Sequence, residues 1–118
     1  MKIPNAERAI VDIGKLRDYC LNPEHGDGKH KARLFSAALG MGIKDAEALR
    51  DALLQAVQTQ EAQLGLYDVH GQRYTINFSL DWCDRQAIIR SGWIIDRGSE
   101  IPRLVTAYPL KGRIDREN

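Results

Sequence analysis

The chain has 118 residues, of which 43% are hydrophobic and 28% charged, and its formal net charge is +1. A chain of this length forms one domain that can fold without a stabilising disulfide or metal ion. Its two cysteines lie far apart in sequence and do not form a disulfide framework. No apolar run reaches the ~20 residues of a membrane span, and the first residues lack the apolar segment of a secretory signal. We therefore expect a cytoplasmic protein without a membrane segment. Near-neutral charge gives no overall sign of a nucleic-acid partner.

The first half of the chain predicts three helices. Asp12 is a favoured N-cap, and the helix that it opens should end at Asn22, because Pro23 disfavours helix in the residue before it. A loop with two glycines follows at 23–28. Apolar residues then recur at helical spacing over about 29–39 and about 45–57.

The second half predicts four strands. Apolar and polar residues alternate strictly over 73–82, which is typical of a half-buried strand, and further strands should cover about 62–69, 86–95 and 103–110. We predict an α+β fold in which three N-terminal helices pack on one face of a four-stranded antiparallel sheet. It forms a single domain over 1–110, with a helical half at about 5–58, a sheet half at about 62–110, and a polar tail at 111–118.

Basic residues are concentrated in the second half. Between Arg85 and Arg113 six basic residues stand against two acidic ones, an excess of four positive charges. Such an excess suits either a solvated surface or a stripe that contacts phosphates.

The start of the second expected helix carries an unusual cluster of basic residues within 28–33. The helix dipole disfavours cations there, so Lys31 on the apolar side and its neighbour His30 indicate either an anion site or a snorkelling lysine beside a surface histidine. His30 is the best general-base candidate, since imidazole exchanges protons near neutral pH. His25, in the loop, is a weaker candidate, and His70 suits a hairpin turn.

Arg90 lies in an otherwise apolar strand register, where a rigid strand would hold its guanidinium as a phosphate clamp or in a structural salt bridge. Gly92 opens space beside Trp93 for either a stacked base or a neighbouring strand. Thr106 and Tyr108 project from one face of the last strand, where they either orient a phosphate or act simply as strand-forming residues.

The sequence shows no metal-binding or nucleotide-binding motif. Cys20, His25, Asp27 and His30 match no zinc spacing, and the two glycines of the loop are not a dinucleotide or P-loop signature. We therefore expect no metal and no cofactor. We expect both Cys20 and Cys83 to be inert, partly buried thiols.

Most of the chain resembles a bacterial domain family of unassigned function, found alone or at the ends of toxin and phage-type proteins. The stretches that carry this resemblance are Ile3-Pro4-Asn5-Ala6, residues 15–22, residues 28–35 with Leu39-Gly40, residues 71–74, residues 90–95 and residues 102–108. More weakly, the order of elements is similar to the barnase/EndoU/colicin/RelE-like ribonuclease superfamily.

The resemblance implies a metal-independent ribonuclease toxin in which a ribose 2′-hydroxyl attacks the adjacent phosphate. It implies RNA, either tRNA or mRNA, as substrate and a small antitoxin or immunity protein encoded nearby as partner. A non-catalytic protein-interaction module is the alternative, and whether the chain is an enzyme stays open. The candidate catalytic residues are His30, Lys31, Arg90, Thr106 and Tyr108, and the candidate substrate-binding residues are Arg73, Ser91, Trp93 and Arg103.

Overall fold

The structure is a computed structural model that describes residues 1–110. The tail expected at 111–118 lies outside these residues. The helical elements are the 3-10 turn η1 (Ala6–Arg8), α1 (Ile13–Lys15), the π-helical turn η2 (Leu16–Cys20), α2 (Lys29–Leu39), the 3-10 turn η3 (Ile43–Asp45) and α3 (Ala46–Thr59). The strands are β1 (Gln63–Asp68), β2 (Gly71–Trp82), β3 (Arg85–Asp96) and β4 (Pro102–Pro109).

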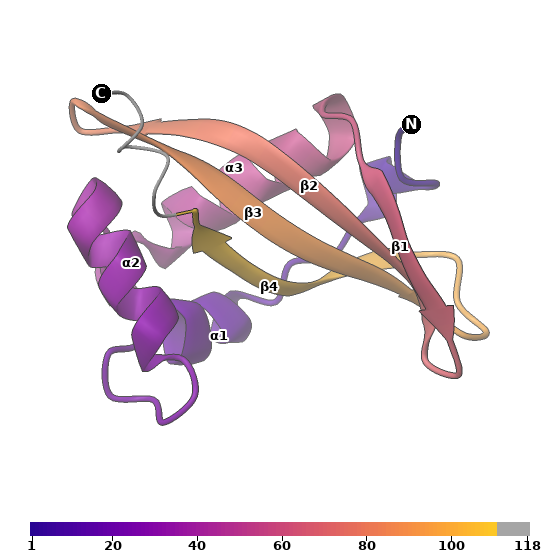
Figure 1. Cartoon of the computed structure of the whole chain (residues 1–118), viewed down its shortest axis with the longest axis horizontal. Helices are drawn as coiled ribbons and strands as arrows, with labels where there is room; N and C mark the ends of the chain where they lie inside the picture. The colour runs from indigo at the N-terminus through magenta and orange to yellow at the C-terminus, as the bar shows by residue number, and fades with distance from the viewer. Residues whose placement is uncertain (111–118) are drawn as a thin grey trace.

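The strands form one antiparallel sheet in the order β1-β2-β3-β4 (Figure 1). Each strand follows its neighbour through a short connection, as a β-meander does. The expected α+β fold, with three helices and a four-stranded antiparallel sheet, is confirmed.

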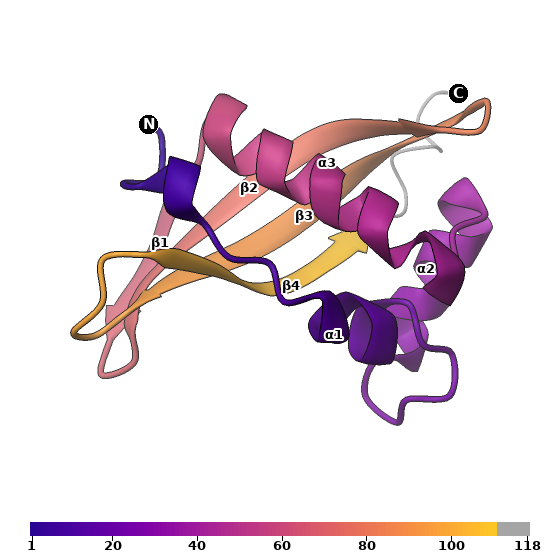
Figure 2. The ribbon, with the colours of Figure 1, turned by 180° about the vertical axis from the view of Figure 1, so that it is seen from behind.

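The helices do not form one uniform layer. Figure 2 shows α3 lying across one face of the sheet, while α1 and α2 lie together at one end, next to β4. The single predicted layer of three helices is thus only partly correct. Because α1 and α2 pack beside the edge strand β4, they create a junction between helices and sheet at that edge.

The alternation over 73–82 is confirmed and separates two faces of the sheet. Tyr74, Ile76 and Phe78 point towards α3 and are buried, whereas Asn77 and Ser79 are exposed on the opposite face. In an antiparallel sheet directly paired residues share a face. The exposed face that carries Asn77 therefore also carries its partner Arg90 on β3 and the partner of Arg90 on β4, Tyr108.

The first helix begins where the sequence predicts. Oδ1 of Asp12 accepts a hydrogen bond from the amide of Gly14 at 2.9 Å. After one turn the helix widens into η2, in which the amide of Leu21 donates to the carbonyl of Leu16, five residues earlier. Such π-helical turns often occur at functional sites. No helix in the described part of the chain is long and apolar enough to cross a membrane.

The two edges of the sheet differ. The edge of β4 is partly covered, because Ile10 donates to Pro102 and accepts from Leu104 in a parallel bridge. The edge of β1 has no strand partner among residues 1–110, and its ladder with β2 is interrupted by a bulge after Leu64. Large apolar side chains in and beside β1 are exposed: Leu64, Leu66, Tyr67 and Val69.

Candidate functional site

A pocket opens where α1, η2 and α2 meet β4. Its volume is about 430 Å³, and it is lined by Lys15, Tyr19, Lys31, Val105, Thr106 and Tyr108. Two lysines, two tyrosines and a threonine thus face one space, and none of the six lining residues is acidic. We call these six residues the lysine–tyrosine pocket.

Lys31 lies between the two tyrosines of the pocket. Its Nζ donates a hydrogen bond to the hydroxyl of Tyr19 at 3.1 Å and is 5.1 Å from the centroid of that ring. It is also 5.7 Å from the ring centroid of Tyr108, so both rings give it a cation–π contact. These contacts fix the ammonium group inside the pocket instead of letting it extend freely into solvent.

Lys15 brings a second positive charge to the same place. Its Nζ is 5.9 Å from the centroid of the Tyr19 ring, so two ammonium groups lie close to one aromatic ring. Within residues 1–110 neither Lys15 nor Lys31 forms a salt bridge. Two positive charges on one pocket without a salt-bridge partner favour binding of an anion there.

Thr106 contributes a polar atom that has no partner. Its Oγ1 is buried and makes no hydrogen bond in the described part of the protein. Buried hydroxyls without a partner are rare, because losing water without replacement costs about 1–3 kcal/mol. The pocket therefore holds an unused hydrogen-bonding group beside its two lysines.

Arg90 lies next to the pocket on the exposed face of the sheet. It is directly paired with Tyr108, and its Nε donates to Oδ1 of Asn77 at 3.1 Å. The structure thus brings Lys31, Thr106 and Tyr108 together at one site, with Arg90 beside them. Their predicted role in catalysis stays a prediction.

His25 binds the backbone of the turn that leads into α2. Nδ1 of His25 accepts hydrogen bonds from the amides of Asp27 and Gly28 at 3.0 and 2.9 Å, and its carbonyl accepts from the amide of Lys29. These amide groups are therefore already paired. His30 is exposed in the first turn of α2 and does not line the pocket.

Ser91 and Trp93 lie in the core, on the other face of the sheet from Arg90 and Tyr108. The indole Nε1 of Trp93 donates to Oγ of Ser91 at 2.9 Å, and that hydroxyl donates to the carbonyl of Ile76 at 2.9 Å. The exposed fraction is 1% for Trp93 and 0% for Ser91. The structure thus places both expected substrate-binding residues inside the protein, because their register directs them under α3.

Arg73 and Arg103 lie on the exposed face, about 13 Å along the strands from Arg90 and Tyr108, given ~3.3 Å per residue. Arg103 makes a bidentate ion pair with Asp96, at 2.6 and 3.0 Å, and Arg73 approaches Asp68 at 3.9 Å. The structure places both arginines outside the pocket, each beside a carboxylate.

The ion pair of Asp96 predicts a small acid-sensitive contribution to stability. The hydrogen bond from Arg103 lowers the pKa of Asp96, and burial opposes it. A lowered folded-state pKa stabilises the protein above the ordinary carboxyl pKa, and this is lost as the pH falls through the folded value. We expect Asp96→Asn to lower the urea midpoint at pH 7. The effect should be small, because both partners of the ion pair are exposed. The difference should shrink as the pH falls below the ordinary carboxyl pKa, and a difference that grew there would contradict this account.

Lys15 and Tyr19 are site residues that the sequence did not predict. They are four residues apart, and this spacing at the end of a short helix places them on the same side. That spacing is a signal in the sequence, but it does not show that Lys31 approaches from another helix.

A family model described as "Domain of unknown function (DUF6883)" matches residues 2–111. The chain belongs to this family. A search of curated proteins finds no match. Among solved structures, this DUF6883 domain is similar to a chain from a contact-dependent growth inhibition toxin–immunity protein complex of Klebsiella pneumoniae 342. The TM-score is 0.67 at 18% identity, over 86% of this chain and 99% of the other, so the likeness establishes a shared fold.

Gly28 lets α2 approach η2 closely enough to form the pocket. A Cβ at this position would lie 2.1 Å from the carbonyl oxygen of Tyr19, whereas a Cβ at Gly26 would meet nothing within 4 Å. We expect Gly28→Ala to lower the free energy of unfolding of the DUF6883 domain by about 1–3 kcal/mol. Gly26→Ala, in the same loop, should change it by less than about 0.5 kcal/mol. Equal urea midpoints for the two variants would contradict this close approach.

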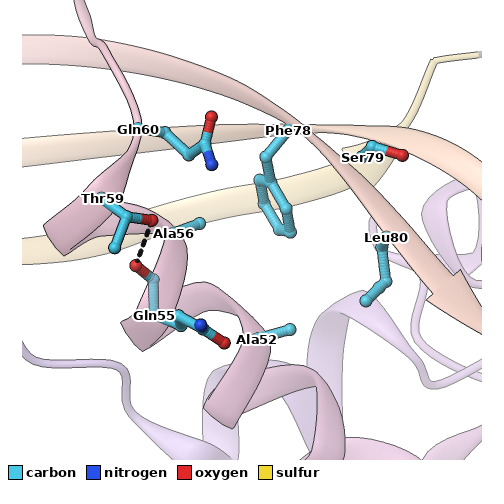
Figure 3. Close-up of a pocket in the computed structure, with 8 residues that line it drawn as sticks. All are labelled: Ala52, Gln55, Ala56, Thr59, Gln60, Phe78, Ser79 and Leu80. Carbon is cyan, nitrogen blue, oxygen red and sulfur yellow. Dashed lines mark hydrogen bonds between the residues drawn. The ribbon is translucent and has the colours of Figure 1, made fainter.

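A second, smaller hollow of about 230 Å³ lies between α3 and β2 (Figure 3). Its lining is uncharged: Ala52, Gln55, Ala56, Thr59, Gln60, Phe78, Ser79 and Leu80. The hydroxyl of Thr59 already donates to the carbonyl of Gln55 at 2.9 Å. This hollow offers no ionisable group for acid–base chemistry.

The described residues bring together no group of three His, Cys, Asp or Glu side chains that could hold a metal ion.

The two cysteines differ from each other. Cys20 is buried, and burial raises the pKa of its thiol, whereas Cys83 is exposed. The expectation of two partly buried thiols is therefore wrong for Cys83, which lies in the exposed tip of the β2–β3 hairpin.

Proposed function

We propose that this DUF6883 domain is a toxin that binds RNA at the lysine–tyrosine pocket and cleaves it without a metal ion. The observation that carries the proposal is the pairing of two lysines with an unpartnered threonine hydroxyl in a pocket without carboxylates. This set suits a phosphodiester, because ammonium groups bind phosphate oxygens and a hydroxyl donates a further hydrogen bond.

The proposed reaction is attack of a ribose 2′-oxygen on the adjacent phosphorus. The O2′–P bond forms, the P–O5′ bond breaks, one proton leaves the 2′-hydroxyl and one is delivered to the 5′-oxygen. Lys31 and Lys15 stabilise the charge on the phosphorane, Thr106 orients it, and Arg90 binds a neighbouring phosphate. Proton transfer falls to Lys31, Tyr19 or Tyr108 in the pocket, or to His30 in the first turn of α2.

The fold comparison supports a toxin-type role with a protein partner. The similar chain comes from a complex of a growth inhibition toxin with its immunity protein. We therefore propose a small neutralising protein as partner of this chain, and bacterial tRNA or mRNA in the cytoplasm as its target.

A non-catalytic interaction or immunity-type role is the second candidate. It is favoured by the exposed apolar side chains in and beside β1, since contiguous apolar surface often marks a protein interface. This role requires no cleavage and no use of the pocket.

Purified protein tests the proposal. It should be incubated with bacterial RNA in EDTA and with an oligonucleotide carrying 2′-deoxyribose at the cleaved position. We expect cleavage of the RNA to 2′,3′-cyclic phosphate and 5′-hydroxyl ends, no cleavage of the deoxy substrate, and growth arrest when the chain is expressed alone. Intact RNA and normal growth would overturn the proposal and favour the interaction module.

A further inference from the structure

We propose that His25 is a positioning residue that holds Tyr19 and the start of α2 in the arrangement the lysine–tyrosine pocket needs. This inference rests on the proposed function, because it assigns the residue that orients that site. His25 does not line the pocket, so it acts through its contacts with other residues.

The first contact fixes the beginning of α2. The unprotonated Nδ1 of His25 accepts hydrogen bonds from the amides of Asp27 and Gly28. Asp27 and Gly28 immediately precede Lys29, the first residue of α2, and the N-cap residue Gly28 has no side chain to form a cap of its own. The imidazole thus fixes the turn that leads into α2, and that helix carries Lys31.

The second contact fixes Tyr19. The two rings meet edge to face, with centroids 5.0 Å apart and an interplanar angle of 88°. Aromatic pairs prefer this geometry. The hydroxyl of Tyr19 in turn accepts the hydrogen bond of Lys31. A continuous series of contacts therefore runs from His25 through Tyr19 to the ammonium group in the pocket.

This role requires an acceptor at the position of Nδ1. Asparagine carries its Oδ1 at the same number of bonds from Cβ as histidine carries Nδ1, whereas glutamine carries its acceptor one bond farther out, as Nε2 is. His25→Asn should therefore keep the two backbone hydrogen bonds, and His25→Gln should lose them. Both variants remove the ring contact with Tyr19, so their difference isolates the acceptor.

The test compares the wild type with both variants. We expect His25→Gln to lower the kcat of RNA cleavage by about tenfold to a hundredfold with little change in KM, because a misplaced group slows the chemical step. His25→Asn should recover most of that loss. Unfolding midpoints measured in parallel keep changes of stability apart from changes of kcat. Equal kcat values for the two variants would overturn the proposal.

A second readout does not depend on cleavage. The nitrogen NMR spectrum of the full chain should show the Nδ1 of His25 unprotonated at neutral pH. The Lys31 amine, mapped by acylation and mass spectrometry, should react faster in His25→Gln than in the wild type or in His25→Asn. A protonated Nδ1 or unchanged Lys31 reactivity would overturn the inference. If RNA stayed intact while these two signatures held, the proposed function would fail and the positioning role would stand.

Discussion

Replacing Lys31 with alanine is expected to lower RNA cleavage by about 10²–10³-fold, the loss seen when one positioned donor is removed from a site of developing charge. Lys31 contacts both tyrosines of the pocket, through the hydroxyl and ring of Tyr19 and the ring of Tyr108. Its loss would remove the ammonium group that sits between both tyrosines. The rate is measured on a defined RNA oligonucleotide, and growth arrest on induction should be relieved in parallel.

The matched control is Lys29→Ala. Lys29 lies in the same first turn of α2 but is exposed and outside the pocket. The Lys29→Ala variant should cleave RNA at a rate within a few-fold of the wild type. The small loss reflects the general attraction between a surface lysine and RNA phosphates. If Lys31→Ala and Lys29→Ala cleaved equally well, the lysine–tyrosine pocket would not be the reaction site.

Replacing Trp93 with alanine is expected to lower the free energy of unfolding by about 3–5 kcal/mol, as truncation of a large buried aromatic does. The indole is 1% exposed and lies in the main core cluster. Its loss would also leave Oγ of Ser91 without its donor. Urea denaturation followed by circular dichroism gives the value, and a loss below about 1 kcal/mol would contradict the core assignment.

Trp93→Phe separates a core role from base stacking. Phenylalanine keeps an aromatic ring in the core but removes the indole donor, so stability should fall by about 1–3 kcal/mol. Cleavage per folded molecule should stay unchanged, because the ring faces away from the pocket. If fully folded Trp93→Phe had an altered KM for RNA, that result would instead favour base stacking on Trp93, one of the two roles that the sequence indicated.

The sequence predicts the sheet well because the signal there is local. Strict alternation over 73–82 shows which residues are buried, and the same period places Arg90 on one face and Trp93 on the other. The sequence also singled out Lys31 as unusual, and in the structure it lines the pocket. A cation on the apolar side at a helix start conflicts with local preferences, and such conflicts often mark functional sites.

The rest of the pocket depends on long-range packing. Val105 lines it at a bulge, where the register between β3 and β4 shifts after Gly92, and an inserted residue of this kind has no clear sequence signal. Tyr19 reaches it because η2 widens and Gly28 lets α2 approach. The contacts of His25 could not be predicted, because its ring binds loop amides and packs against Tyr19 only once the loop is folded.

The unequal edges of the sheet limit how copies of this protein can associate through their backbones. Ile10 occupies part of the β4 edge, and helices pack beside that strand, so among residues 1–110 the edge of β1 is the more open of the two. Two copies that met along β1 would use up both open edges, leaving none for a third. Backbone-mediated self-association along β1 would therefore close at a pair.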